Sequence, residues 1–190
     1  MKEKEKLTGA ELGTVYHLVF QHVPLELAYD DFGEHLSESL DEMVDKEIIT
    51  KEQIEMIEPC KVERFFKTEL GKRISQNKDN LTRELNFTLG VSYKNIEIYE
   101  NVEEPDNNSE ENDEIIVIQG AIDYLVEEDD GFLLIDFKTD SIKEGELERL
   151  KDDYKVQLDY YKMAVEKIYN KEVKETYIYH ILLEKAIRVD

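Results

Sequence analysis

Three ionisable residues, Asp123, Asp136 and Lys138, have the types and the spacing that could carry out chemistry in this chain of 190 residues. They lie in two apolar, β-prone runs, one ending near Val126 and the other beginning at Phe132, and the segment between these runs reads Glu-Glu-Asp-Asp-Gly. An Asp-Gly pair between two such runs predicts a β-hairpin, because these residues tolerate the positive φ of a tight turn.

The position of the hairpin loop decides which charged side chains face each other. A two-residue loop at 129–130 places Asp123 opposite Asp136, whereas a loop at 130–131 places Asp123 opposite Lys138. Both registers leave the three side chains on one face, because side chains alternate with period two and the registers differ by an even shift. Directly opposed Cβ atoms are about 4.5 to 5.5 Å apart, so two carboxylates there need a shared proton or a bound cation. A hard divalent ion with oxygen ligands, Mg²⁺ above all, is the natural candidate.

The second run has one wholly apolar face and one face that carries charge. The apolar face holds Leu133, Ile135 and Phe137, and the other face holds Leu134, Asp136 and Lys138. A buried strand with Asp and Lys two residues apart bears a desolvation cost that packing does not explain. The alternative is an edge hairpin with a solvated polar face and a surface ion pair.

A helix near the N-terminus presents a further polar stripe. It is predicted to open with a capping box at 8–11 and to be limited by Pro24. Gly13, His17 and Gln21 recur on it every four residues. Gly13 would let another backbone or a ligand approach His17 closely, although a lone histidine on a helix is also commonly a hydrogen-bonded structural residue.

The remaining elements follow from hydrophobic periodicity and divide the chain into a helical part, about 8–76, and a part with the sheet and a long helix, about 80–190. Helices are expected at 32–49, at 50–57 after a capping box, from Cys60 to Leu70 and at 146–169; strands are expected at 81–91 with an extension to 98, at 115–126, 132–138, 175–183 and 186–189. Residues 101–114 are polar and acidic, which is typical of a surface loop. Tyr154, Gln157 and Tyr161 share one stripe of the long helix, a pattern that by itself favours an amphipathic core face.

Composition narrows the classes of function. The net charge of −22 excludes a nucleic-acid partner held by general electrostatics. The single cysteine, Cys60, excludes an internal disulfide and a cysteine-ligated zinc or iron–sulfur centre, and we expect it to be a core residue. Since no apolar run approaches a membrane span and the start lacks a signal sequence, the chain is expected to be cytoplasmic, without a membrane partner, and to form one domain over 1–190.

Taken in order, these features resemble the PD-(D/E)xK nuclease superfamily, and more closely its RecB-like branch. Within that branch, they look most like the C-terminal nuclease domains of the AddA family of helicase–nuclease subunits. The matching pieces are Gly13-Thr-Val-Tyr-His17 with Gln21, Gly120-Ala-Ile-Asp123, Asp136-Phe-Lys138-Thr-Asp140, and Tyr154-x-x-Gln157-x-x-x-Tyr161. The resemblance implies an α/β, restriction-endonuclease-like fold, in which a mixed sheet is flanked by helices and the N-terminal half is helical.

The resemblance also implies metal-dependent hydrolysis of phosphodiester bonds. Asp123 and Asp136 would ligate Mg²⁺, for which Mn²⁺ could substitute, and His17 would be a further ligand. Lys138 would orient the attacking water and stabilise charge on the phosphate. Gln157 and Tyr161 would position the substrate, and three further candidates are Glu84, Gln21 and Asp140.

The implied partners are single-stranded DNA, the helicase domains of the same parent polypeptide and a second, AddB-like subunit, in double-strand-break repair by recombination. The sequence contains no Gly-x-x-x-x-Gly-Lys-Ser/Thr phosphate loop, so a motor would lie outside these 190 residues. One alternative is a catalytically inactive module that keeps the nuclease fold and binds a protein through its acidic surface. Another is a metal-dependent hydrolase of small phosphoesters.

Overall fold

The computed structural model describes residues 9–25, 32–92 and 115–190. Along the described residues the elements are α1 (Gly9–His22), α2 (Phe32–Asp45), α3 (Lys51–Ile54), α4 (Pro59–Lys67), α5 (Glu69–Gln76), η2 (Lys78–Asn80), β1 (Leu81–Ser92), β2 (Ile115–Glu128), β3 (Gly131–Lys138), η5 (Glu144–Glu146), α6 (Leu147–Tyr169), β4 (Val173–His180) and β5 (Lys185–Arg188). Thr8 of the expected first capping box, the expected strand extension to 98 and the acidic segment 101–114 lie outside the described residues.

Within those described ranges, five strands form one mixed sheet in the order β1-β2-β3-β4-β5. The β2–β3 and β4–β5 pairs are antiparallel, whereas β3 and β4 are parallel. Parallel neighbours need a long crossover, and α6 supplies it between β3 and β4. This mixed sheet flanked by helices, after a helical N-terminal half, confirms the predicted restriction-endonuclease-like α/β fold.

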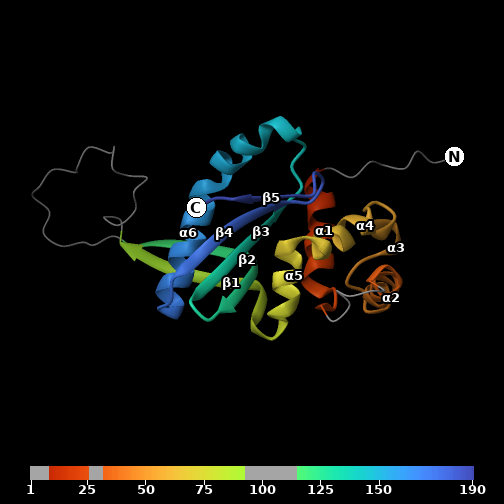
Figure 1. Ribbon diagram of the computed structural model, residues 1–190, viewed down its shortest axis with the longest axis horizontal. Helices are drawn as coiled ribbons and strands as arrows, with labels where there is room; N and C mark the ends of the chain where they lie inside the picture. Colours follow the sequence, from red (N-terminus) through yellow and green to blue (C-terminus); the bar gives the residue numbers. More distant parts are fainter. Residues whose placement is uncertain (1–8, 26–31, 93–114) are drawn as a thin grey trace, which may run out of the picture. The chain divides into compact units, whose positions relative to one another are not determined.

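Helices cover both faces of β3, which is central and buried over almost its whole length. Figure 1 shows α6 on one side of the sheet and α1, α4 and α5 on the other. On the α1 side, the ring of Phe137 stacks on Phe20 with centroids 4.1 Å apart. On the α6 side, Phe132 packs against Tyr169 at 5.1 Å. The alternative of a solvated edge hairpin is therefore wrong, and Asp136 lies within a buried strand.

The helix expected from Cys60 to Leu70 is in fact two helices. Thr68 breaks it with an extended backbone (φ −70°, ψ 161°) and begins α5 by accepting a hydrogen bond from Gly71 N to its side chain. An N-cap threonine offers the chain this alternative to continuing a helix. Because α4 begins at Pro59, Cys60 lies in its first turn, where it is exposed; the expectation of a core cysteine was wrong.

Helix α2 also ends earlier than expected, at Asp45. Glu47 adopts a left-handed backbone conformation (φ 59°) directly after it, which is a common way for a helix to end. The capping box of Thr50 and Gln53 forms as predicted and starts α3.

The hairpin turn forms at 129–130, with Glu128 paired to Gly131. No residue of this turn and no described glycine has positive φ, so the reason given for the Asp-Gly signal was wrong. Gly131 is required for a different purpose, since a Cβ there would lie 2.5 Å from Lys174 Cγ and 2.7 Å from the backbone oxygen of Glu172. The absence of a side chain lets β3 approach the start of β4.

The chain divides into two compact units, Met1–Leu85 with Ile122–Asp190 and, between them in sequence, Asn86–Ala121. All of the residues that the sequence marks as candidates for chemistry belong to the first unit. Across the described residues, no helix has both the length and the apolar character needed to cross a membrane.

Candidate active site

Asp123 on β2 and Asp136 on β3 meet through the hairpin register. Tyr124 pairs with Ile135, and one further step of the same register aligns Asp123 with Asp136. The Phe137 backbone N–H donates to Asp123 Oδ2 at 2.7 Å, which holds this carboxylate against β3. Both are buried, with 8% of Asp123 and 3% of Asp136 exposed. Of the two registers considered, the structure has the one that brings the carboxylates together.

His17 joins this pair from α1. Its Nδ1 lies 2.9 Å from Asp123 Oδ1, in hydrogen-bonding contact. Burial opposes the positive charge of the imidazole, but the hydrogen bond and the charge of Asp123 outweigh it, and the pKa of His17 is raised. Gly13, one turn earlier, permits this approach, because a Cβ there would lie 2.8 Å from Thr139 Oγ1. The predicted function of Gly13 is thus realised by a side chain that directly follows β3.

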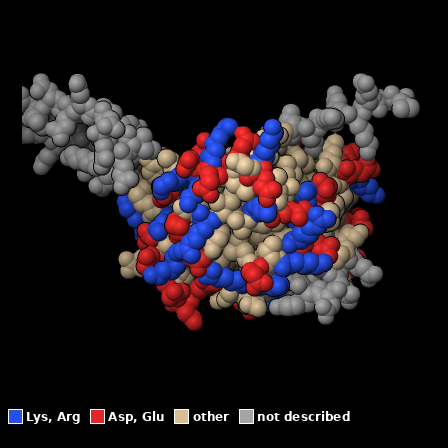
Figure 2. All heavy atoms as spheres, turned by 45° about the horizontal axis from the view of Figure 1, so that its top comes forward, with Lys and Arg blue, Asp and Glu red and all other residues tan. Residues whose placement is uncertain are grey.

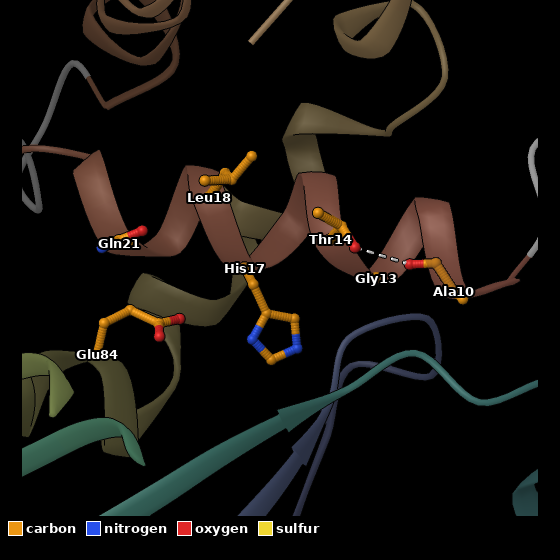
Figure 3. Close-up of a pocket in the computed structure, with 7 residues that line it drawn as sticks. All are labelled: Ala10, Gly13, Thr14, His17, Leu18, Gln21 and Glu84. Carbon is orange, nitrogen blue, oxygen red and sulfur yellow. Dashed lines mark hydrogen bonds between the residues drawn. The ribbon is translucent and has the colours of Figure 1, made fainter. Parts of the chain in front are cut away.

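Glu84 enters the same site through an unusual backbone. It lies within β1 but has a left-handed conformation, with φ 49°. Such a conformation costs of order 1 kcal/mol or more for a residue with a side chain, and it is concentrated at functional sites. The Glu84 carboxylate points towards His17 and lines, with Gln21, an open hollow of about 440 Å³ beside α1 (Figure 3). Burial and the nearby charge of Asp123 raise the pKa of Glu84.

Arg83, next to Glu84 in sequence, was not among the residues predicted to take part in the site. Its guanidinium Nη1 donates to three carbonyl oxygens at the end of α1, those of Phe20, Gln21 and Val23. Positive charge is favourable at a helix C-terminus, where carbonyls lack intrahelical partners. β1 is therefore fastened to the helix that carries His17 one residue before Glu84.

Asp136 and Lys138 form an ion pair on the α6 side of β3. Lys138 Nζ lies 2.6 Å from Asp136 Oδ2. The angles of this contact do not make a hydrogen bond, and among the described residues no donor is hydrogen-bonded to Oδ2. Burial is the largest cause of the raised pKa of Asp136, about 6; Lys138 opposes this rise and Asp123 adds to it.

The long helix α6 contributes to the environment of Lys138 from above the sheet. Lys138 Nζ donates to Gln157 Oε1 at 3.2 Å and lies 4.1 Å from the centre of the Tyr154 ring. Gln157 therefore lies where the sequence placed it, next to the lysine. Tyr161, one turn further along α6, is buried.

Asp140 is brought to the site by two residues that the sequence did not single out for chemistry. Its Oδ1 accepts from Tyr154 OH at 3.0 Å, and its backbone oxygen accepts from His180 Nε2 at 2.9 Å. Tyr154 could have been found, since it precedes Gln157 by three residues on the same stripe. His180 could not, because only the parallel pairing of β3 and β4 places it beside Lys138.

The donor groups present fit a divalent metal ion. One donor atom from each of His17, Glu84 and Asp123 lies within 4.8 Å of the others. Two oxygen atoms bound to one Mg²⁺ are at most about 4.2 Å apart, so a small side-chain movement brings all three groups within reach of one ion. Asp136 lies outside this group and instead presents the buried Oδ2 that accepts no hydrogen bond from the described residues. The structure therefore adds Glu84 to the candidate ligand set and leaves Asp136 on its border.

A mixed sheet with two buried carboxylates and a lysine on β2 and β3 defines a restriction-endonuclease-like architecture. The chain belongs to the PD-(D/E)XK nuclease superfamily, whose sequence model matches residues 1–186. Membership assigns the chain to a family of nucleases.

Several curated relatives share one description, that of the AddA-type subunit of an ATP-dependent helicase/nuclease. The relative from Thermoanaerobacter sp. strain X514 is 44% identical over 179 residues, which are 94% of this chain and 14% of the relative. That from Clostridium novyi strain NT is 39% identical over 191 residues, covering all of this chain and 15% of the relative. That from Clostridium botulinum strain Hall is 36% identical over 190 residues, again the whole chain and 14% of the relative. The chain thus spans about one seventh of the length of these relatives.

Proposed function

We propose that this chain is a Mg²⁺-dependent deoxyribonuclease and that residues 1–190 act as one nuclease domain. The observation that carries the proposal is the convergence of Asp123, Asp136 and Lys138 from two neighbouring strands, with His17 reaching Asp123 from α1. A buried pair of carboxylates next to a lysine and an imidazole costs stability and has a direct use in phosphodiester hydrolysis.

In this proposal the carboxylates hold the cation and the lysine acts on the substrate. Asp123, His17 and Glu84 would hold Mg²⁺, or Mn²⁺ in its place, and Asp136 Oδ2 would face it. When bound, the ion would supply charge neutralisation at the phosphate and a lowered pKa for a water molecule. Lys138, kept cationic by Asp136, would orient the attacking water and stabilise negative charge in the transition state.

The residues around this centre would position it. Gln157 accepts from Lys138 Nζ and would fix the direction of the ammonium group. Tyr161 would support the same part of α6, and Gln21 lines the hollow in which the substrate backbone would lie. Asp140 would act through its contact with Tyr154.

The substrate that fits this proposal best is single-stranded DNA delivered by a helicase. The relatives are named as helicase/nuclease subunits and are about seven times longer than the chain, which leaves room for a motor in the same polypeptide. A net charge of −22 also favours delivery by other domains over capture from solution. We therefore propose an AddA-type role in double-strand-break repair by recombination, in the cytoplasm, with an AddB-like second subunit.

A metal titration tests the site. Calorimetry with Mg²⁺ or Mn²⁺ should show saturable binding by the wild-type protein, and Asp123→Ala should abolish it. Glu84→Gln should weaken binding at least about tenfold if Glu84 is a ligand. Asp129→Ala, which removes an exposed carboxylate of the same hairpin, is the control and should bind as the wild type does.

The same preparations separate the proposal from its alternatives. A non-catalytic interaction module would show only diffuse, salt-sensitive metal association that Asp123→Ala leaves unchanged. A hydrolase of small phosphoesters would act on such compounds in preference to single-stranded DNA. Either result would replace the proposal.

A further inference from the structure

The ammonium group of Lys138 is surrounded on three sides. Asp136 Oδ2 lies at 2.6 Å, Gln157 Oε1 at 3.2 Å and the centre of the Tyr154 ring at 4.1 Å. The first two contacts follow from the proposed function, which assigns both residues a role. The ring of Tyr154 is the third contact, and the proposed chemistry gives it no role.

A ring at this distance restrains a lysine without neutralising it. A cation over the face of an aromatic ring is attracted by the quadrupole of the ring, and the ring offers no proton acceptor. The flexible four-carbon stem of lysine otherwise has many rotamers. Tyr154 therefore closes the side of Lys138 that Asp136 and Gln157 leave open, while the ammonium keeps its charge and its protons.

Tyr154 is itself fixed by Asp140. Its hydroxyl donates to Asp140 Oδ1 at 3.0 Å. Burial, followed by the hydrogen bond to Asp140, raises the pKa of Tyr154 to about 12. The phenol thus keeps its proton at any working pH, and the ring is held at both its hydroxyl and its position on α6.

Asp140 is in turn anchored by a histidine with a defined tautomer. The Leu183 backbone N–H donates to His180 Nδ1 at 3.1 Å, so Nδ1 carries no proton. Nε2 must then carry the proton, and it donates to the Asp140 backbone oxygen at 2.9 Å. His180 is fully buried, so this chain of contacts ties the segment after β3 to the turn after β4.

We propose that Tyr154 is a positioning residue that holds the Lys138 ammonium in its reactive place, with Asp140 and His180 holding Tyr154. This inference rests on the proposed function, because it gives Lys138 the role assigned there. Tyr154 belongs neither to the group of candidate metal ligands nor to the lining of the hollow beside α1, so its effect passes through the lysine.

Two substitutions of Tyr154 separate the ring from the hydroxyl. Tyr154→Phe keeps the ring over Lys138 and removes the tether to Asp140, whereas Tyr154→Leu removes both. Tyr177 offers a matched control, since its hydroxyl donates to Glu175 Oε2 at 2.9 Å in a similarly half-buried phenol–carboxylate pair. Tyr177→Phe and Tyr177→Leu repeat the two changes elsewhere on the sheet.

The first readout is cleavage of single-stranded DNA with Mg²⁺ by the full polypeptide. Tyr154→Leu should lower kcat on the order of 10- to 100-fold with KM within about twofold, as expected for a misplaced reacting group. Tyr154→Phe should recover most of that loss, and both Tyr177 variants should cleave as the wild type does. Wild-type kcat in Tyr154→Leu, or a change in KM alone, would overturn the proposal.

The second readout follows the lysine directly and does not depend on activity. The rate of acetylation of Lys138 is measured by mass spectrometry, with the other lysines of the chain as internal references. It should rise selectively in Tyr154→Leu, less in Tyr154→Phe, and not in the Tyr177 variants. An unchanged rate in Tyr154→Leu would show that the ring does not hold the lysine, even if the wild-type protein failed to cleave and the proposed function had to be abandoned.

Discussion

At the scale of single residues, the site is a place where the chain gives up stability. Asp136 is buried in the central strand, its Oδ2 accepts no hydrogen bond from the described residues, and the pKa of its carboxyl is raised to about 6. Glu84 adds a left-handed backbone. Costs of this kind, concentrated at one point, are expected at a functional site and are unusual elsewhere.

Asp136→Asn should therefore stabilise the metal-free protein at neutral pH. The folded-state pKa of about 6 lies above the ordinary value of 3.8, so folding favours the protonated carboxyl. The stability that Asp136 allows is fully present below about pH 4 and is lost as the pH rises through about 6. In urea unfolding with a chelator, the variant should gain on the order of 1 to 3 kcal/mol at about pH 8 and almost nothing at about pH 4.

Asp129→Asn is the control for this experiment, because it neutralises an exposed carboxyl of the same hairpin and should change neither value. An equal gain for Asp136→Asn at both pH values would show that the buried charge is not the cause.

Sequence patterns located the ionisable residues better than they located the supports of these residues. Alternation along two runs was enough to place Asp123, Asp136 and Lys138 on one face. The left-handed backbone of Glu84 has no signal in its residue type, since glutamate rarely adopts it. The contact of His180 with Asp140 depends on long-range pairing, which local periodicity does not contain.

At the scale of elements, the positions of helices and strands followed from periodicity, but several of their ends did not. Thr68 breaks a continuous apolar pattern because its side chain caps the next helix, and the period of the flanking residues hides that break. The hairpin was predicted correctly for a wrong reason, since its turn uses no positive φ. What Gly131 provides is space beside β4, a tertiary requirement.

Gly131→Ala tests this explanation of the hairpin. The new Cβ would lie 2.7 Å from a backbone oxygen, which cannot move as a side chain could. Crowding of this kind should lower the free energy of unfolding by about 1 to 3 kcal/mol. Gly145→Ala is the matched control, because a Cβ there meets nothing within 4 Å, and it should be nearly neutral. Similar stabilities of the two variants in urea unfolding would contradict the packing explanation.

At the scale of the whole molecule, charge sets how the site can meet its substrate. Acidic residues outnumber basic ones by 46 to 24, and seven of the acidic residues fall in the segment 101–114, which has no basic residue. On the face shown in Figure 2, basic side chains are interleaved with acidic ones. A surface of this kind gives little general attraction for a phosphate backbone, so delivery by attached domains is the consistent expectation.

The isolated chain should accordingly bind single-stranded DNA very weakly when no divalent ion is present. At physiological salt with a chelator, we expect a Kd weaker than about 10⁻⁴ M, together with a log–log salt dependence shallower than about 2. Fluorescence anisotropy with a labelled oligonucleotide provides both values. Micromolar affinity with a steep salt dependence would point to a basic binding surface and contradict this account of delivery.

The central claim, that Lys138 and its two carboxylates form a nuclease centre, is tested most directly by cleavage of end-labelled single-stranded DNA with Mg²⁺. The wild-type protein and Lys46→Ala, which removes an exposed lysine paired with Glu42, should give the same product ladder. Lys138→Ala should lose at least about 100-fold in rate while keeping its fold. Cleavage by Lys138→Ala at the wild-type rate would contradict the account.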